Sequence, residues 1–325
     1  MSSRIARIIS AFAVVVIASA PAACGLSGER IAVPTSEGYD FADFRSDPAQ
    51  GTTISGVLVV PSSGPILGAA ILSHGAGGTG ARQRRAARLF AEAGIAAFVL
   101  DHFTARGVSS VARDQLRITE QQMASDIFAA RDVLSERLEL DGARIGAVGW
   151  SKGGTAVTLS AVGRLGRFVA PQGEPLGFAA AFYPFCGFQL DEEALSTPLL
   201  MLLAGQDDWT PSAPCLRQIK AWASAGENAE WVLYNEASHG FDSRSGRFRV
   251  DQAITVRDTG PGCTLDVDEG GRTVTIAKTL SLTTLEERRQ FLAACGERGV
   301  TFEGDAKAGP LALERLLSFV TDRLR

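Results

Sequence analysis

Short runs of apolar residues recur along the chain between residues 52 and 234, each bounded by glycine, proline or polar residues. Such runs are typical of β-strands that are covered on both faces of a sheet, because neither face of the strand meets water. The runs are Thr52–Val60, Ala69–Ser73, Ile95–Leu100, Arg144–Val148, Phe178–Phe182, Pro198–Ala204 and Ala229–Tyr234.

Helical patterns lie between most of these runs. Helices are predicted over Arg82–Ala93, which precedes Gly94, and from Pro211 to about Ala225. A longer helix carries apolar residues at intervals of three or four on one face: Met123, Ile127, Ala130, Leu134 and Leu138. Strands that alternate with helices predict an α/β fold with a doubly wound, mostly parallel sheet. Ligands of such sheets bind beyond the carboxyl ends of the strands.

The region from about residue 243 to residue 309 interrupts this alternation. Leu265–Ile276 is predicted to form a hairpin with Gly270-Gly271 at its turn, and Thr284–Ala294 is predicted to be helical. An amphipathic helix, Leu311–Leu324, closes the chain. We therefore predict one domain over residues 51–325, with a small C-terminal insertion at about 243–309.

Composition and charge agree with one large domain. The chain has 325 residues, of which 46% are hydrophobic, and this is enough to bury a deep core. The formal net charge of −4 gives no reason to expect a nucleic-acid partner.

The first residues have the pattern of a targeting segment. Arg4 and Arg7 supply positive charge ahead of Ile8–Ala20, an uncharged apolar stretch that is short for a bilayer span. We predict that residues 1–23 are a signal peptide and that the protein is exported: to the periplasm, to a membrane as an anchored lipoprotein, or out of the cell.

Two ends of this signal peptide are possible. Cleavage after Ala22 would use an A-x-A site, whereas cleavage before Cys24 would leave a cysteine that is lipidated and attached to a membrane. A retained membrane anchor is the remaining alternative. Residues 24–50 are polar and are predicted to form an extended entry segment.

Export changes the interpretation of the cysteines. The chain has five cysteines, and the four beyond Cys24 form an even number, which favours two disulfides in an oxidising compartment. Three pairings are possible for four cysteines. Proximity along the chain favours Cys186–Cys215 and Cys263–Cys295. A metal site is not expected, because no pair has C-x-x-C spacing and the chain has three histidines.

A candidate nucleophile follows the predicted strand Arg144–Val148. Gly149-Trp150-Ser151-Lys152-Gly153 matches the pattern G-x-S-x-G between a strand and a helix. The pattern is typical of a serine that stands on a strained turn, with glycine neighbours that let strand and helix approach closely. The alternative is an ordinary glycine-rich turn. We predict that Ser151 is the nucleophile.

A serine hydroxyl needs a base that takes its proton and a carboxylate that orients this base. Where the serine stands on such a turn, the acid and then the histidine follow it along the chain. His239 is the histidine that follows Ser151, because His74 and His102 precede it. We predict that His239 is the base and that a solvated surface histidine is the alternative.

Three aspartates lie between Ser151 and His239. Asp191 belongs to an acidic run that is most simply a solvated face. Asp207 and Asp208 follow a predicted strand directly, so one of them can accept the imidazole N–H. The other would cap the helix that begins at Pro211 or face solvent. The commonest hydrolase pattern has a proline four residues after the acid, and this favours Asp207.

The oxyanion of the reaction needs two backbone N–H donors. The Lys152 N–H is one candidate, since it lies at the start of a helix, where the dipole favours negative charge. The second donor is expected in the loop His74-Gly75-Ala76-Gly77-Gly78, after the strand Ala69–Ser73. We predict the N–H of Ala76, with Gly75 as the alternative donor and a plain glycine-rich turn as the alternative structure.

The motifs HGAGG, GWSKGG, AGQDDWTP and ASHGF, in this order, resemble the dienelactone hydrolase family of the α/β-hydrolase superfamily. The resemblance covers roughly residues 52–241 and the last helix. It implies an α/β-hydrolase fold with Ser151 as nucleophile, Asp207 as acid and His239 as base. It also implies that the backbones of Ala76 and Lys152 form the oxyanion hole. The serine acyl-enzyme reaction that these residues predict requires no cofactor.

One residue departs from the family pattern. The dienelactone hydrolases that name the family have cysteine at the position of Ser151, so the dienelactone substrate is not carried over. A serine acyl-enzyme suits ordinary carboxylic esters. Solvent exposure is expected for the Lys152 side chain, although it could screen an anion. Arg106 could meet an anionic substrate group, although such an arginine more often holds a loop in place.

Aromatic residues near the motifs are candidates for substrate binding. We predict that Trp150, Phe185 and Trp209, together with Phe241, edge an open site, with a place in the core as the alternative. The connection between Phe182 and Pro198 is too short for a large lid.

The sequence thus predicts an exported serine hydrolase that cleaves small carboxylic esters or lactones through a Ser151–His239–Asp207 triad. A polyester or cell-wall acyl esterase is the alternative enzyme. The alternative of another class is a non-catalytic envelope lipoprotein with a hydrolase fold.

Overall fold

The computed structural model describes residues 28–45, 51–171, 173–190, 192–257 and 259–325. The predicted signal peptide, residues 1–23, and Cys24 lie outside this range. None of the helices in the described ranges is long and apolar enough to cross a bilayer.

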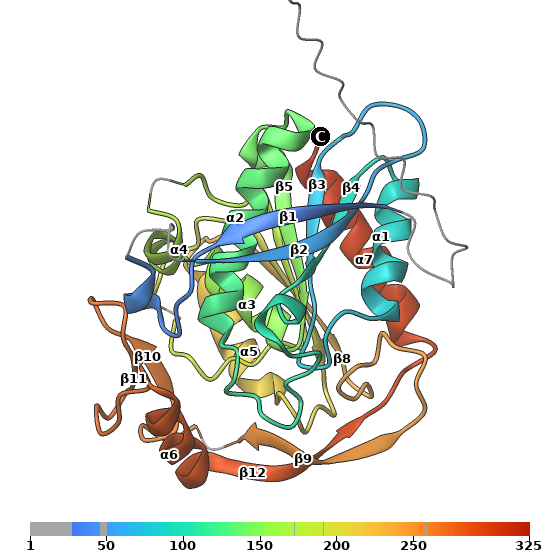
Figure 1. Cartoon of the computed structure of the whole chain (residues 1–325). Coiled ribbons are helices and arrows are strands. Elements are labelled where there is room, and N and C mark those ends of the chain that lie inside the picture. The colour runs from blue at the N-terminus through green and yellow to red at the C-terminus, as the bar shows by residue number, and fades with distance from the viewer. Residues whose placement is uncertain (1–27, 46–50, 172, 191, 258) are drawn as a thin grey trace, which may run out of the picture.

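The core of the fold is an 8-stranded sheet with the order β1-β2-β4-β3-β5-β6-β7-β8 (Figure 1). Strand β2 pairs antiparallel with β1 and β4, and all other pairs are parallel. This confirms the predicted doubly wound, mostly parallel sheet. The strands are β1 (Glu29–Thr35), β2 (Thr52–Val59), β3 (Ala69–Ser73), β4 (Ala96–Asp101), β5 (Ile145–Trp150), β6 (Ala179–Phe182), β7 (Leu199–Ala204) and β8 (Ala229–Tyr234).

Helices cover both faces of the sheet. Successive strand residues alternate between two cores: Ile71 packs in the core that contains the helices α2 and α5, and Leu72 in the core that contains α1 and α7. Every residue of β3 is therefore buried, which explains the continuous apolar runs of the sequence. The helices of the domain are α1 (Ala81–Glu92), α2 (Glu120–Leu138), α3 (Lys152–Ala161), α4 (Gly163–Val169), α5 (Ser212–Ser224) and α7 (Ala308–Arg323).

The described part of the entry segment contributes to the sheet. Residues Glu29–Thr35 form the edge strand β1, and Phe41–Arg45 form the 3₁₀ helix η1. Pro34 lies within β1, opposite Thr53. An edge strand tolerates a proline because one side of the strand has no neighbour that needs its N–H.

The insertion folds as a cover over the carboxyl ends of the parallel strands (Figure 1). The predicted hairpin is present as β10 (Leu265–Val267) and β11 (Thr273–Thr275), and the predicted helix as α6 (Leu285–Cys295). The sequence did not reveal the antiparallel ribbon of β9 (Phe248–Val256) and β12 (Gly296–Phe302). Its strands are far apart along the chain, so no local pattern links them.

Hydrogen bonds fasten this ribbon to the loops at the carboxyl ends of the strands. The Thr301 N–H and hydroxyl donate to the Asp208 carboxylate, at 2.7 and 2.9 Å. The Glu303 N–H donates to the carbonyl of His239 at 3.0 Å. The Ile254 N–H donates to Gln115 Oε1 at 2.7 Å. The cover is thus bonded to the loops that carry the candidate acid and base.

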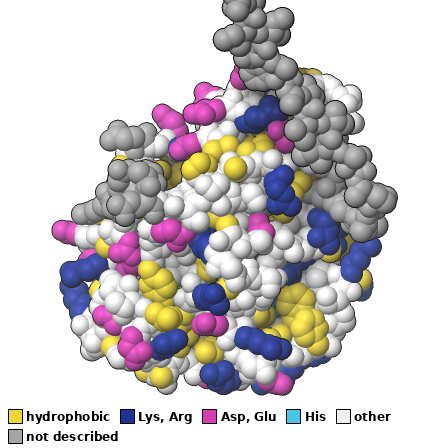
Figure 2. All heavy atoms as spheres, in the orientation of Figure 1, with side chains coloured by type: hydrophobic (Ala, Val, Ile, Leu, Met, Phe, Trp, Pro, Cys, Tyr) yellow, Lys and Arg dark blue, Asp and Glu magenta, His cyan; other side chains and the backbone are white. Residues whose placement is uncertain are grey.

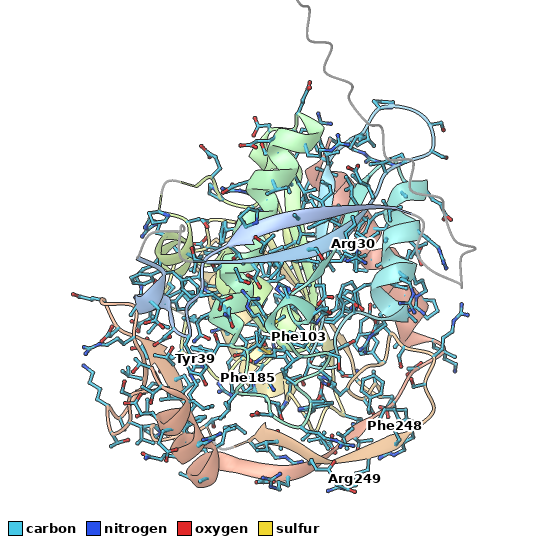
Figure 3. The ribbon with its side chains drawn as sticks, viewed as in Figure 1. Arg30, Tyr39, Phe103, Phe185, Phe248 and Arg249 are labelled. Carbon is cyan, nitrogen blue, oxygen red and sulfur yellow. A yellow bond between two sulfur atoms is a disulfide. The ribbon has the colours of Figure 1, made fainter. Side chains whose placement is uncertain are left out.

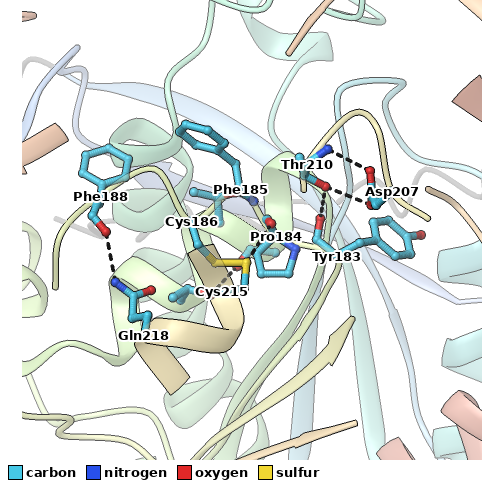
Figure 4. Close-up of a disulfide and its surroundings, with 12 residues drawn as sticks. Tyr183, Pro184, Phe185, Cys186, Phe188, Asp207, Thr210, Cys215 and Gln218 are labelled. Atoms are coloured by element: carbon cyan, nitrogen blue, oxygen red, sulfur yellow. Dashed lines mark hydrogen bonds between the residues drawn. A yellow bond between two sulfur atoms is a disulfide. The ribbon is translucent and has the colours of Figure 1, made fainter. Parts of the chain in front are cut away.

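Both disulfides have the pairing that proximity favours. Cys186–Cys215 joins the segment after β6 to α5, beside Phe185 (Figure 4), and Cys263–Cys295 joins the start of the hairpin region to the end of α6. Each closes a loop of about thirty residues, which stabilises the fold by about 3–4 kcal/mol in the chain-entropy model.

Side chains of both charge signs are interspersed over the face that Figure 2 shows, with apolar side chains between them.

Candidate active site

The turn at Ser151 has the conformation that the sequence pattern predicts. Ser151 follows β5 directly and has φ 53° and ψ −119°, and α3 begins at Lys152. Positive φ is strained for a residue with a side chain, and such strain is common at functional sites. The turn exposes the serine at the carboxyl end of the central strand.

Two glycines allow this turn to close. A Cβ atom on Gly149 would overlap the carbonyl oxygen of Gly153, and a Cβ on Gly153 would overlap the carbonyl oxygen of Ser73. Strand β5, helix α3 and the end of β3 therefore approach one another more closely than any side chain would permit.

His239 lies between Ser151 and Asp207. The His239 Nε2 atom is 3.0 Å from Ser151 Oγ, and its Nδ1 atom is 2.8 Å from Asp207 Oδ2. The other carboxylate oxygen of Asp207 accepts the N–H groups of Trp209 and Thr210, at 2.9 and 2.8 Å (Figure 4 shows the second bond). The structure thus brings the predicted nucleophile, base and acid together in hydrogen-bonding order.

Thr210 was not predicted and also contacts the candidate base. Its hydroxyl donates to the carbonyl oxygen of Tyr183 at 2.9 Å and lies 3.1 Å from His239 Nδ1. Figure 4 shows this hydroxyl between Tyr183 and Asp207. Aspartate side chains often bond the backbone of the residues that follow them in a turn, and an aspartate that directly follows a strand is the signal that the sequence offered.

The Asp208 carboxylate has a partner that the sequence did not predict. We expected the second aspartate to cap a helix or to face solvent, but its carboxylate accepts two hydrogen bonds from Thr301 of β12. The reason is the cover, which lies over this loop and was not foreseen. Asp207, and not Asp208, contacts His239.

The loop after β3 packs against the serine turn. A Cβ atom on Gly75 would lie 3.3 Å from the Ser151 Cβ, and the Gly78 N–H donates to the Gly75 carbonyl at 3.1 Å. Within the described part of the chain, no hydrogen bond uses the Ala76 N–H as donor. The Lys152 N–H opens α3, where N–H groups have no acceptor inside the helix. Both predicted donors are therefore available beside Ser151.

The Lys152 side chain is buried, contrary to the expectation of solvent exposure. Its Nζ atom lies 2.6 Å from Glu120 Oε1 and donates to the Gln115 carbonyl at 3.0 Å. Burial lowers the pKa of Lys152, although the Glu120 carboxylate opposes this shift. Helix α2, which carries Glu120, passes close to the serine turn and provides this partner.

A cavity of about 110 Å³ opens beside Ser151. Its walls come both from the domain that holds the 8-stranded sheet and from the cover. Ala76, Lys152, Phe185 and Trp209 line it on the domain side, as do Gln115, Leu116, Thr119, Glu120, Thr155, Phe188 and Thr210. Ile254, Thr255, Val256, Leu265, Leu282, Arg288, Phe291 and Leu292 line it on the side of the cover.

Two of the predicted aromatic residues do not reach this cavity. Trp150 is 0% exposed, and its indole N–H donates to Asp242 Oδ2 at 2.8 Å. Phe241 is also fully buried, against Tyr183. The Trp150 side chain lies instead on the face of the sheet that α1 and α7 cover. It packs there in the same core as Val148. The other two, Phe185 and Trp209, line the cavity.

The predicted open site is wrong as well. The expectation rested on the short connection after Phe182, but the cover comes from the C-terminal insertion. Its residues Ile254 and Phe291 form part of the cavity wall.

Arg106 lies away from the cavity and holds a buried cluster together. Its guanidinium donates to both carboxylate oxygens of Asp126, at 2.7 and 3.0 Å, and to Glu37 at 3.0 Å. Of the two roles considered for Arg106, the structure shows the one in which it holds a loop in place, and not contact with a substrate.

The arrangement can perform nucleophilic chemistry. The imidazole can take a proton from the serine hydroxyl, and two N–H groups can bind an oxyanion. In the described ranges, no group of three or more His, Cys, Asp or Glu side chains is placed to hold a metal ion.

The sequence matches known proteins over more than half of its length. A model of the dienelactone hydrolase family matches residues 54–258. A relative from Methylorubrum extorquens named "Putative carboxymethylenebutenolidase" is 27% identical over 227 residues, which are 67% of this chain and 73% of the relative.

Solved structures share the fold. Esterase 2 of Thermogutta terrifontis phosphonylated by cyclosarin is 18% identical with a TM-score of 0.50, over 66% of this chain and 85% of that chain. The same esterase phosphorylated by paraoxon is 19% identical with a TM-score of 0.50, over 68% and 87%.

The geometry predicts different effects of substituting the two neighbouring aspartates. A fluorophosphonate should label Ser151, and Asp207→Asn should slow this labelling by about a hundredfold or more, because His239 loses its carboxylate partner. Asp208→Asn should change the rate by less than about tenfold, since Asp208 contacts the cover. Intact-protein mass spectrometry measures both rates, with Ser151→Ala as the unlabelled control. Equal slowing in the two variants would contradict the assignment of the acid.

Proposed function

Because this chain belongs to the dienelactone hydrolase family and is thus a carboxylic-ester hydrolase, we propose that it cleaves small carboxylic esters or lactones through an acyl-enzyme on Ser151. The observation that supports this most directly is the unbroken hydrogen-bonded series from Ser151 through His239 to Asp207. Substitution of Ser151 by alanine tests it.

Acylation uses each of these groups. His239 Nε2 takes the Ser151 hydroxyl proton as Oγ attacks the ester carbonyl, and Asp207 stabilises the imidazolium through Nδ1. The oxyanion of the tetrahedral intermediate accepts hydrogen bonds from the Ala76 and Lys152 N–H groups. The intermediate collapses when the C–O bond breaks and His239 gives its proton to the leaving alcohol.

Deacylation repeats these steps with water. His239 takes a proton from the water as its oxygen attacks the acyl carbonyl, and then returns the proton to Ser151 Oγ as the ester bond to the enzyme breaks. The product is the free carboxylic acid. For a lactone, the alcohol and the acid leave as one hydroxy acid.

The cavity limits the acyl group. Its volume of about 110 Å³ is below the roughly 150 Å³ of an engineered cavity that takes up benzene. Phe185, Ile254 and Phe291 give it apolar walls. We therefore propose acyl groups of about two to six carbons.

The same cavity disfavours the alternative of polymeric esters. A polymer chain needs an open groove along which several units can bind, whereas the cover lies over Ser151 and is bonded to the loops of Asp208 and His239. A non-catalytic envelope lipoprotein would not need three side chains in hydrogen-bonding order.

We also propose that the protein is exported. The charge and hydropathy of residues 1–23 support this, and so do the two disulfides, which form in oxidising compartments. Mass spectrometry of the mature N-terminus should find a chain that begins at Ala23, or at a lipidated Cys24. An N-terminus at Met1 would contradict export with cleavage.

Hydrolysis of p-nitrophenyl esters from acetyl to palmitoyl tests both the nucleophile and the size of the cavity. We expect kcat/KM to be highest for short chains and to fall by about a hundredfold or more by palmitoyl, because long chains exceed the cavity. Ser151→Ala should abolish turnover, whereas a folded Ser151→Ala protein with full activity would disprove the assignment.

Removing one wall of the cavity should change this preference. Phe291 of α6 lines the cavity and is 4% exposed, so Phe291→Ala should move the preferred acyl chain to a longer ester by two or more carbons. Phe248→Ala is the matched control, because Phe248 lies on the outer ribbon with 48% exposure (Figure 3). An unchanged preference in Phe291→Ala would show that the acyl group binds elsewhere.

A further inference from the structure

A buried group of polar side chains lies behind the loop that carries Ala76, and the reaction steps above do not use it. His74, His102 and Asp126 are all 0% exposed. They come from the ends of β3 and β4 and from α2, respectively. Burying a polar group costs free energy unless the group has a hydrogen-bond partner. The hydrogen-bond partners of these three side chains therefore indicate their role.

The partners of His74 determine which of its nitrogens carries the proton. The His102 backbone N–H donates to His74 Nε2 at 3.2 Å, so Nε2 acts as an acceptor and carries no proton. The Nδ1 atom lies 2.8 Å from the Gly75 carbonyl oxygen, which can only accept. Nδ1 therefore carries the proton and donates to Gly75. Burial lowers the pKa of His74 to about 3, so the ring stays neutral.

The Gly75 carbonyl belongs to the same peptide group as the Ala76 N–H. A peptide group is planar and trans, so its C=O and N–H point in opposite directions. A hydrogen bond that holds this carbonyl therefore also sets the direction of the Ala76 N–H. The Gly78 N–H donates to the same carbonyl at 3.1 Å from within the turn.

Other contacts hold the His74 ring in place. The ring of Phe103 meets it edge-to-face with centroids 4.4 Å apart, and the ring of His102 lies at 5.1 Å. Phe103 is itself buried, and Figure 3 labels it near the centre of the view. His102 in turn is held at both nitrogens, by Ser73 Oγ at 2.9 Å and by Asp126 Oδ2 at 2.8 Å.

Ser73, His102 and Asp126 repeat the order of a catalytic triad, but they do not form a second active site. All three side chains are 0% exposed, so no substrate reaches Ser73. The Asp126 carboxylate is also occupied by the fork of Arg106 and by the Thr35 hydroxyl, at 2.8 Å. Burial opposes ionisation of Asp126, but the bonds from His102 and Arg106 outweigh it and lower its pKa. The cluster is a rigid support.

We propose that His74 is a positioning residue of the oxyanion hole: its Nδ1–H holds the Gly75–Ala76 peptide so that the Ala76 N–H points at the developing oxyanion. The inference rests on the proposed function, because it needs a reaction with an oxyanion. The hydrogen bond to the carbonyl also polarises the peptide and makes its N–H a stronger donor. The effect is larger in the transition state than in the bound ester, because negative charge develops on the carbonyl oxygen as the serine attacks.

Substitution of His74 tests this role. His74→Leu removes the donor at similar size, and we expect kcat for p-nitrophenyl acetate to fall by about 10- to 100-fold with KM within about threefold. This is less than the 10²–10³-fold loss on removing an oxyanion donor outright. His74→Asn places an amide N–H near the position of Nδ1 and should recover most of the lost kcat. A kcat of His74→Leu equal to wild type would overturn the proposal, as would His74→Asn being as impaired as His74→Leu.

A transition-state analogue separates positioning from a loss of stability. Across the variants, the Ki of a trifluoromethyl ketone should rise in proportion to the loss of kcat/KM, because its hemiketal oxyanion uses the same N–H. The Ki of the product acid should stay unchanged. Equal changes in both constants would overturn the proposal.

Trp222→Phe is the matched control for stability. Trp222 is fully buried in α5, and its indole N–H donates to the carbonyls of Leu190 and Glu193. We expect this variant to lower the melting temperature as His74→Leu does and to keep kcat. If wild type hydrolyses no ester, the proposed function fails; if wild type is active and Ser151→Ala is not, an unchanged His74→Leu defeats the positioning role alone.

Discussion

The close approach of β5, α3 and the end of β3 is the constraint on which the rest of the site depends. Gly149 and Gly153 permit it, since a Cβ atom at either position would overlap a backbone oxygen. The approach forces Ser151 into a strained conformation and places it against the loop of Gly75. The proposed nucleophile and the proposed oxyanion donors therefore lie in one packing arrangement rather than in separate parts of the fold. Such sites are precise because the scaffold, and not a flexible loop, sets the distances.

The support for this arrangement comes from two different directions. Behind the loop of residues 74–78, which carries Ala76, a fully buried cluster links His74 to His102 and Asp126. In front of it, the cover reaches across the carboxyl ends of the strands and bonds to the loops that carry Asp208 and His239. The neighbouring aspartates have different partners, because the Asp207 carboxylate contacts His239 and the Asp208 carboxylate accepts two hydrogen bonds from Thr301 of the cover. One dipeptide thus contacts both the proposed base and the cover, which forms one wall of the cavity.

Much of the fold and of the candidate site was predictable because its signals are local. A strand that is covered on both faces must be apolar throughout, so β3 and β5 are visible as short runs. A serine on a strained turn needs glycines beside it, and the parallel sheet brings strand ends to one edge. What could not be predicted involves partners that are distant in sequence. Whether a lysine such as Lys152 is exposed depends on Glu120, which belongs to another helix.

The sequence by itself therefore determined the class of fold and the order of the hydrolase motifs, and it marked Ser151, His239 and Asp207 as candidates, with Asp208 as the alternative acid. Only the tertiary structure decided which aspartate meets His239, which aromatic residues reach the cavity, and that β9 and β12 close over the site. The physical reason is the range of the interactions. Propensity, periodicity and turn chemistry act over a few residues, whereas hydrogen bonds such as Thr301 to Asp208 form only after the chain has folded.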